Sequence, residues 1–416
     1  MSAALYDDGL RRADAHEANR WLATSLKHFA LGLGVFLSGF VIDEPAPYEL
    51  YMVGLIAIWA IFGLRISKTV APLLVLLIVF NIGGMISTLQ MDKLYNAPLY
   101  NAVSTFLALS AVFYAGVIEA DWKLLPVVFR AYLATALITA ALGILGYFHA
   151  FPGAGVFTLY DRAKGAFQDP NVFGPFLLLP ANWLVYKLLT GKISAAPLRA
   201  AVLLVIALGI FLSFSRAAWG FAAFTIVLTT FFLFIRSRSG LFRLRILLLA
   251  VLAVAFLTAA IVIALQMPSV HDLFVQRAKL TESYDVSHFG RFARYPIGLL
   301  MSMEHPLGIG ALNFGRIYGE DTHDIWLKAL LDYGWIGFAC WLTMTVLTLG
   351  AGFRILLRDR PWQPFLLCSW VVYLGHVLIG TVIDTDHWRH FYMLLGIIWG
   401  CIGLEMRHQM ALKQPG

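Results

Sequence analysis

Residues 198–235 read LRAAVLLVIALGIFLSFSRAAWGFAAFTIVLTTFFLFI. The stretch contains two apolar runs, each close to the roughly 20 residues that a helix needs to cross a bilayer. Little more than Ser213, Ser215 and Arg216 separates them. The runs are continuous and lack the alternation of inward and outward residues that barrel strands show. The stretch therefore predicts two membrane-spanning helices joined by a tight hairpin, with an arginine at the bilayer boundary.

Similar runs recur along the chain of 416 residues, of which 60% are hydrophobic and 13% charged. An ordinary soluble domain has roughly 25% charged residues. The sequence therefore predicts an all-α, polytopic integral membrane protein with about twelve transmembrane helices. The predicted spans are residues 28–42, 48–64, 70–90, 99–118, 125–148, 172–189, 198–214, 217–235, 244–266, 326–352, 362–383 and 390–405.

Lysine and arginine residues orient the predicted spans, because short cytoplasmic connections retain positive charge. The pattern fits a cytoplasmic segment at 1–27, spans one to nine at 28–266, and a periplasmic segment at 267–323. Spans ten to twelve at 324–405 and a cytoplasmic tail at 406–416 follow. Residues 1–27 carry too many charges for a cleaved signal, and we expect a helix on the membrane surface there. The net charge of +7 is then mainly a topology signal, so no nucleic-acid partner is expected.

Several basic residues fall on the predicted outer side, against this topological bias. Cations placed there need another reason, and an anionic substrate would supply one. They are Arg162, Lys164, Arg216, Arg277, Lys279, Arg291, Arg294 and Arg316.

Two of the outer segments are short. In residues 161–175, Asp169 and Asn171 flank Pro170 and predict a sharp, capped turn into span six. In the hairpin after span seven, Arg216 could extend to lipid phosphates or hold a substrate phosphate through two parallel hydrogen bonds.

The segment 267–323 is too short, and too interrupted by Gly and Pro, to bury its own core. Its apolar spacing predicts short amphipathic helices on the outer leaflet, between spans nine and ten. The glycine-rich stretch 305–314 would let the backbone approach a ligand closely. His323, at the start of span ten, is either a general base working near neutral pH or a structural capping residue.

These three segments, together with the start of span ten at 322–337, resemble the superfamily of O-antigen ligases and polymerases, bacterial inner-membrane glycosyltransferases, and the ligases in particular. The family pattern K-G-x-F-x-x-P-N-x-x-G stands at residues 164–174, and an S-x-S-R hairpin stands at 213–216. A G-R pair at 290–291 precedes the glycine-rich loop at 306–314, and a helix start of the form H-N-x-x-L begins at His323. Asp324 stands where the family usually has asparagine, which leaves the hydrogen bonding of His323 open.

The resemblance implies transfer of O-antigen from undecaprenyl diphosphate to a sugar hydroxyl of lipid A-core, at the periplasmic face of the bacterial inner membrane. It implies an inverting reaction with no metal or other cofactor, in which His323 is the general base. Arg216 and Arg291 would bind the diphosphate and stabilise its growing negative charge, with Lys164 and Arg294 as weaker candidates. Further candidates to line the donor or acceptor site are Asp169, Asn171, Asn313, Asp324, His387 and Arg389.

Other functions stay open at this stage. An O-antigen or capsule polymerase would use the same donor, as would a protein O-oligosaccharyltransferase, although the latter often has a C-terminal soluble domain. A membrane transporter would need ionisable residues and broken helices at mid-membrane. The predicted polar groups gather at one face instead, which favours an enzyme. The segment 384–390, with two aspartates and two histidines, lacks metal-ligand spacing and is interpreted as a solvated loop that contacts the acceptor.

Overall fold

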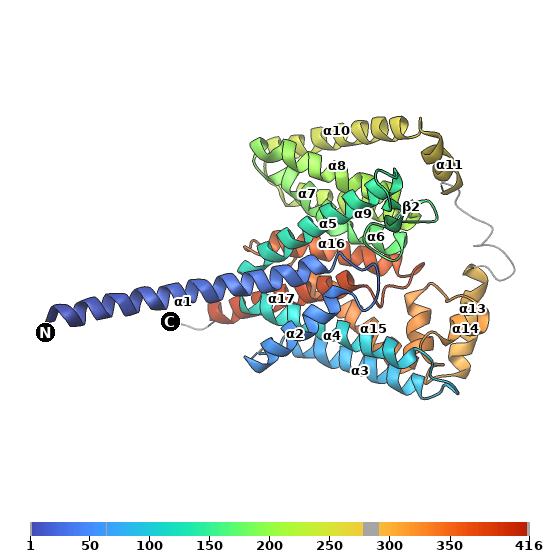
Figure 1. Ribbon diagram of the computed structural model, residues 1–416, viewed down its shortest axis with the longest axis horizontal. Coiled ribbons are helices and arrows are strands. Elements are labelled where there is room, and N and C mark those ends of the chain that lie inside the picture. Colours follow the sequence, from blue (N-terminus) through green and yellow to red (C-terminus); the bar gives the residue numbers. More distant parts are fainter. Residues whose placement is uncertain (1, 64, 278–290, 414–416) are drawn as a thin grey trace.

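The computed structural model describes residues 2–63, 65–277 and 291–413, and helices dominate this part of the chain (Figure 1). Strands are limited there to one hairpin of β1 (Thr158–Leu159) and β2 (Arg162–Ala163). The 3₁₀ turns are η1 (Trp122–Leu124), η2 (Ala154–Phe157) and η3 (Ile193–Ala195). The α-helices are α1 (Ser2–Leu37), α2 (Pro47–Ile61), α3 (Ala71–Thr88), α4 (Ala97–Ala120), α5 (Leu125–Tyr147), α6 (Pro170–Phe176), α7 (Leu178–Thr190), α8 (Ala196–Leu212), α9 (Arg216–Arg236), α10 (Gly240–Ala264), α11 (Pro268–Arg277), α13 (Arg291–Glu304), α14 (Asn313–Tyr318), α15 (Ile325–Ile355), α16 (Gln363–Ile379) and α17 (Arg389–Lys413).

The prediction of an all-α polytopic membrane protein is confirmed. Among the described residues, seven helical stretches are long and apolar enough to cross a membrane. Shorter apolar helices occupy residues 21–37, 47–61 and 363–379. The predicted short helices between spans nine and ten are α11, α13 and α14, although the part of that segment at 278–290 lies outside the described residues.

The predicted span 172–189 consists of two helices, because the chain breaks at Leu177 between α6 and α7. Pro180 has no N–H group to donate to the carbonyl four residues earlier, at Phe176. The hydroxyl of Tyr132 donates to that carbonyl instead, at 2.8 Å. A side chain of α5 thus satisfies the backbone group that the proline leaves without a partner.

At the N-terminus, α1 is one continuous helix from Ser2 to Leu37 and projects beyond the bundle (Figure 1). The sequence predicted a separate surface helix for residues 1–27, and the helix shows no break at residue 27. Its helix-favouring residues continue directly into the first apolar run, with no Gly or Pro at the expected boundary. Both ends of the chain lie at the same end of the bundle (Figure 1).

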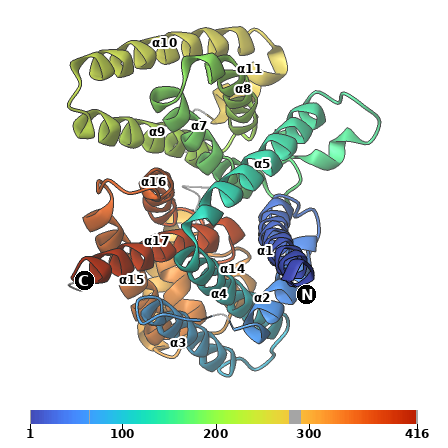
Figure 2. The ribbon, with the colours of Figure 1, turned by 90° about the vertical axis from the view of Figure 1, so that its left-hand side faces the viewer.

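The pair α4 and α17 lies at the centre of the bundle (Figure 2). Small residues let these two helices approach closely, as is usual between membrane helices. A β-carbon added at Gly396 would lie 2.5 Å from the carbonyl oxygen of Ala111, and one at Gly400 would lie 2.7 Å from the Cβ of Ile118. Because α17 is fixed in this way, the loop that precedes it is fixed as well.

A second close pair, α3 and α15, meets where α15 is broken at Gly334, which has φ 67°. At this break the N–H of Trp335 donates to the carbonyl of Pro306 at 3.0 Å. The carbonyl of Leu331, which a regular helix would have paired with Trp335, accepts from the N–H of Ile309 at 2.8 Å and from the Ser87 hydroxyl at 3.2 Å. The break in α15 therefore fixes the segment 306–310 against α3 and α15.

Candidate active site

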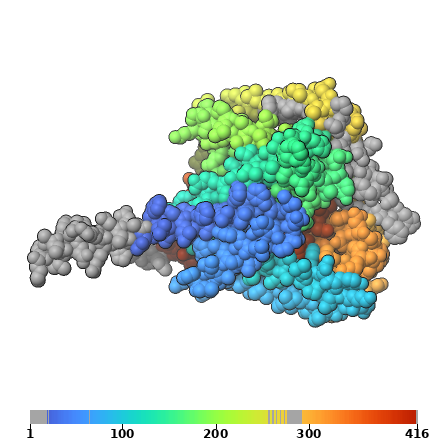
Figure 3. Space-filling view, in the orientation of Figure 1, coloured from blue at the N-terminus to red at the C-terminus, as the bar shows by residue number. Residues whose placement is uncertain are grey.

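The candidate residues lie in loops and in the first turns of helices, at the end of the bundle away from the chain termini (Figure 1). Backbone hydrogen bonds join loops that are distant in sequence. The N–H of Val41 donates to the carbonyl of Ala166 at 2.6 Å, and the N–H of Ile325 donates to the carbonyl of Gly380 at 2.7 Å. In Figure 3 the red C-terminal part of the chain is visible at this end, between the green surface and the orange surface. Each hydrogen bond thus joins two loops that are far apart in sequence, by 125 positions (166 minus 41) and by 55 positions (380 minus 325).

The connection 161–175 has the predicted capped turn. The Asp169 carboxylate accepts from the N–H of Asn171 at 2.6 Å and so caps α6. Gly165 has φ 55°, and a β-carbon there would lie 2.5 Å from the Thr139 hydroxyl, so only glycine fits. Lys164 is half-buried.

Arg162 joins this connection to the hairpin between α8 and α9. It is 6% exposed, and its Nε donates to the carbonyl of Ser213 at 2.8 Å. Its Nη2 donates at 2.8 Å to the Oδ1 of Asn171, so Asn171 supports an arginine. Arg162 was predicted only as one of the outer cations, with no role of its own. Its place two residues before the family motif at 164–174 could have indicated that Arg162 belongs to the site.

The hairpin places Arg216 at the start of α9. Ser215 is the N-cap, and its side chain accepts from the N–H of Ala218. Gly174 of α6 packs against this turn, since a β-carbon there would lie 2.6 Å from the Cβ of Ala218. Arg216 is half-buried at this junction of α6, α8 and α9.

Arg216 and His323 lie at the same end of the bundle, on neighbouring elements. The Phe221 ring of α9 packs against Gly375 of α16, where an added β-carbon would lie 2.2 Å from it. Arg216 precedes Phe221 by five residues and Gly380 follows Gly375 by five, and each step spans about 7.5 Å of helix. The two helices run in opposite directions, so Arg216 is level with Gly380. Gly380 accepts the hydrogen bond from Ile325, two residues after His323.

The His323 ring lies between two carboxylates. Its Nδ1 is 3.5 Å from the Oδ2 of Asp384, and its Nε2 is 3.4 Å from the Oε1 of Glu320. The side chain is 30% exposed, and the residue has φ 52°, a conformation that side-chain-bearing residues adopt rarely. Unusual backbone conformations of this kind occur often at functional sites.

Asp324 caps α15, and its carboxylate accepts hydrogen bonds from backbone N–H groups of that helix. Its Oδ1 accepts from the N–H groups of Trp326 at 2.8 Å and Leu327 at 3.0 Å. Burial raises the pKa of Asp324, and these two hydrogen bonds oppose the increase. A carboxylate can therefore serve where the family usually has an amide, because both accept from the first turn of a helix.

Arg294 pairs with Glu320. Its Nη1 lies 2.6 Å from the Oε2 of Glu320 and donates to the carbonyl of Asp321 at 3.2 Å. Burial alone would raise the pKa of Glu320, but Arg294 and His323 lower it below its usual value. Arg294 thus stabilises the ionised form of Glu320, the carboxylate that lies next to His323. Arg291 is the first residue of α13, and its side chain lies outside the described part of the structure.

A buried ionic cluster that the sequence analysis missed lies beside His323. Lys328, with a side chain 5% exposed, is 3.1 Å from Asp321, 3.5 Å from Asp332 and 3.8 Å from Asp384. Asp384 therefore contacts both Lys328 and His323. The available signal was the pair Lys328 and Asp332, four residues apart inside a predicted span, where charges are costly unless they serve a purpose.

Asp386 lies deeper in the same loop and is 1% exposed. It accepts hydrogen bonds from the hydroxyls of Tyr100 at 2.7 Å and Tyr333 at 3.3 Å, and it lies 3.1 Å from the Nδ1 of His387. Burial would raise the pKa of Asp386, but His387, Lys328 and the Tyr100 hydroxyl lower it well below its usual value. His387 is held from its other side by the carbonyl of Tyr100.

The interpretation of 384–390 as a solvated loop is wrong. Besides the burial of Asp386, Arg389 is 9% exposed and pairs with Glu44, at 2.9 Å, and with Glu49. These carboxylates belong to the loop after α1 and to α2, so Arg389 ties the N-terminal helices to α17. The physical reason is that polar groups of a loop between packed helices find partners on those helices rather than in water.

The glycine-rich loop packs against protein. Gly310 has φ 93°, and a β-carbon there would lie 2.2 Å from the Met91 side chain. Its N–H donates to the Ser87 hydroxyl at 2.8 Å. Asn313 follows and donates through its amide to the carbonyl of Ile309 at 2.9 Å. The close approach that these glycines permit is used here against Ser87 of α3 and against Met91, and the expected approach to a ligand stays a prediction.

Within the described residues, no group of three or more His, Cys, Asp or Glu side chains is arranged to hold a metal ion. The chemistry that the described groups offer is a histidine flanked by carboxylates, with arginines on neighbouring elements. Such a set can remove a proton from a hydroxyl and stabilise negative charge on a leaving group.

A comparison with protein families matches residues 201–342 to the family described as O-antigen ligase. A search of the curated proteins found no match. The matched range contains Arg216, Arg294 and His323, and runs from α8 to the first half of α15. Members of the family are glycosyltransferase-like membrane enzymes with lipid-linked glycan substrates. Residues 201–342 of this chain are thus a domain of the O-antigen ligase family.

Proposed function

We propose that the protein is an O-antigen ligase, which transfers O-antigen from undecaprenyl diphosphate to a sugar hydroxyl of lipid A-core. The reaction would take place at the periplasmic face of the bacterial inner membrane, with both termini of the chain in the cytoplasm. The observation that carries the proposal is the placement of Arg216 level with Gly380, on an element adjacent to the turn that holds His323. An imidazole and a guanidinium group thus lie at the same end of the bundle, which supports their proposed roles as base and phosphate-binding cation.

In the proposed reaction, His323 takes the proton from the acceptor hydroxyl through Nε2. The hydroxyl oxygen attacks the anomeric carbon, the bond from that carbon to the diphosphate breaks, and the configuration inverts. The diphosphate leaves with the electron pair of this bond, and Arg216 and Arg291 stabilise the added negative charge. Lys164 is a further candidate for phosphate contact. Arg294 is a weaker one, because its described partner is Glu320.

Asp384 would act through His323. Its carboxylate, 3.5 Å from Nδ1, favours the tautomer with hydrogen on Nδ1 and leaves Nε2 to accept a proton. It would also stabilise the imidazolium that forms during transfer. Glu320 lies 3.4 Å from Nε2, in the position that the acceptor hydroxyl must take, so we expect the acceptor to displace it.

The test is reconstitution of the purified protein in liposomes that contain lipid-linked O-antigen, with lipid A-core as the acceptor. We expect glycosylated lipid A-core without added ATP or divalent metal, and no product with Arg216→Ala or His323→Ala. Melting temperature in detergent separates loss of activity from loss of folding. Arg199→Ala, at the opposite end of the bundle, is the matched control and should stay active.

The same assay separates the alternatives. An O-antigen or capsule polymerase would lengthen the glycan on its own lipid carrier when lipid A-core is absent. A protein O-oligosaccharyltransferase would need a protein acceptor. Product formation that survives both Arg216→Ala and His323→Ala would refute the assignment of the site, whichever acceptor is used.

A further inference from the structure

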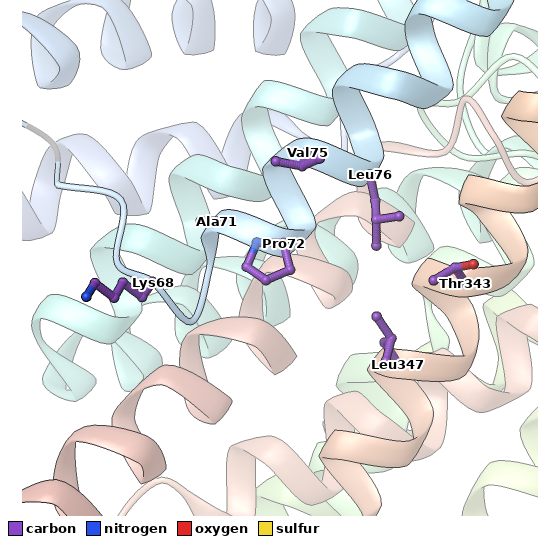
Figure 4. A pocket seen from close by; sticks show the side chains of 7 residues that line it. All are labelled: Lys68, Ala71, Pro72, Val75, Leu76, Thr343 and Leu347. Atoms are coloured by element: carbon purple, nitrogen blue, oxygen red, sulfur yellow. The ribbon is translucent and has the colours of Figure 1, made fainter.

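A groove of about 530 Å³ opens between α3 and α15 (Figure 4), and none of its lining residues belongs to the candidate active site. Both helices are membrane-spanning candidates. The side chains of Val75 and Leu347 in its walls are 57% and 43% exposed, so the groove faces the lipid. Lys68, Ala71, Pro72, Val75, Leu76, Thr343 and Leu347 line it. The result is an open apolar groove with the cation of Lys68 at one end.

The groove exists because α3 and α15 diverge from a fixed contact. Near the candidate site, a β-carbon added at Gly83 would lie 3.2 Å from the N atom of Gly337, so the backbones touch. Seven residues earlier on α3 and six residues later on α15, Leu76 and Thr343 lie on opposite walls of the groove (Figure 4). Away from the glycine contact, the side chains of α3 and α15 leave a gap that the protein does not fill.

Two cations lie toward the same end of this groove. Lys68, in the turn before α3, is one of the residues that line it. Arg354 lies on α15 about two helical turns beyond Leu347, which also lines it. Arg354 follows Leu347 by seven residues and therefore lies on the same face of α15. Both cations are exposed, and within the described part of the chain neither is paired with a carboxylate.

We propose that this groove binds an anionic phospholipid of the leaflet opposite the candidate active site, with one acyl chain along its apolar walls and the phosphate between Lys68 and Arg354. The apolar lining matches an acyl chain, and basic residues near the membrane surface attract anionic lipids. A zwitterionic lipid offers the same chain and phosphate, but its positive headgroup is repelled by the same two cations. The site lies at the other end of the bundle from His323, so the proposal does not depend on the proposed reaction.

The test is native mass spectrometry of the purified full-length protein, titrated with dioleoyl phosphatidylglycerol or dioleoyl phosphatidylcholine. We expect phosphatidylglycerol to bind about tenfold more tightly, as two surface cations warrant. Lys68→Glu combined with Arg354→Glu should abolish the preference. Leu347→Trp, which fills the groove and leaves the cations in place, should weaken the binding of both lipids.

Lys192→Glu is the matched control, because it reverses an exposed charge at the same end of the bundle but on the loop between α7 and α8. It should leave the preference unchanged. Equal binding of the two lipids by the unmodified protein would overturn the proposal. So would a loss of preference in Lys192→Glu as large as in the double variant, since that would indicate a diffuse charge effect without a defined site.

Discussion

Asp384 and Glu320 contact the two ring nitrogens of His323 at 3.5 Å and 3.4 Å, and we predict that neutralising them has different effects on activity. Asp384→Asn removes the carboxylate that orients the ring and stabilises its protonated form during proton transfer. Glu320→Gln removes a negative charge from the nitrogen that must accept the proton. Asp384→Asn should therefore lower the maximal rate, whereas Glu320→Gln should leave the maximal rate unchanged and shift only its dependence on pH.

The magnitudes follow from exposure. Asp384 is 21% exposed, and a charge pair at 3.5 Å under partial screening contributes about 1–2 kcal/mol, or about 5- to 30-fold in rate. Glu320 is 57% exposed, so solvent screens its pair with His323 to at most about 1 kcal/mol, and the displacement of the pH profile should be small. A nearby carboxylate favours protonated histidine. Its removal should therefore move the acid limb of the pH profile to lower pH and leave the plateau at high pH unchanged.

The assay is the initial rate of lipid A-core glycosylation in liposomes between pH 5 and pH 8, at saturating donor. Asp359→Asn is the control, since this aspartate pairs with Arg236 at the opposite end of the bundle. The reasoning would be refuted by an unchanged plateau in Asp384→Asn, or by a Glu320→Gln profile that moves to higher pH. Equal loss of plateau rate in both variants would also contradict the assigned roles.

Three further predictions concern stability, measured as unfolding of the purified protein in detergent. Arg162→Met should cost about 1–3 kcal/mol, because it leaves the buried acceptors on Ser213 and Asn171 without their donor, and a cost below about 0.5 kcal/mol would contradict the tie between the two motifs. Gly310→Ala should cost at least about 2 kcal/mol, because a β-carbon is strained at φ 93° and would overlap a neighbouring side chain; Gly220→Ala, where an added β-carbon meets open space, should cost nothing measurable. The pKa of Asp386 is lower in the folded protein than its ordinary value of 3.8, so its ionised form stabilises the fold at any pH above 3.8. This stabilisation is lost as the pH falls below 3.8. The decrease in melting temperature between pH 6 and pH 3 should therefore be smaller in Asp386→Asn than in the unmodified protein.

Local sequence was sufficient for the helices and for their caps. Apolar runs of about 20 residues have few alternatives to a spanning helix, because the bilayer offers backbone groups no other partner. Asp169 and Ser215 cap the helices that follow them, as their residue types predict, because a cap depends on atoms within three residues. The break between α6 and α7 was also readable in principle from Pro180.

The contacts of the candidate site depend on partners far along the chain. The Nδ1 atom of His323 meets Asp384, which lies 61 residues later in the sequence (384 minus 323), and Arg162 meets Ser213 at a separation of 51. No local preference encodes which loop reaches which side chain. Glycine contacts such as those between α3 and α15 set how closely two helices approach, and hence where their loops end.

Hydrophobicity and local capping thus determined the helical membrane fold, the tight hairpin before Arg216 and the position of His323 at the start of a helix. Tertiary structure alone decided that much of the 384–390 loop is buried, that Asp384 contacts both Lys328 and His323, and that the glycine-rich loop packs on protein. The physical reason is the range of the forces concerned. Burial of apolar runs and hydrogen bonds within one turn act locally, whereas the pairing of buried charges follows from how whole helices pack.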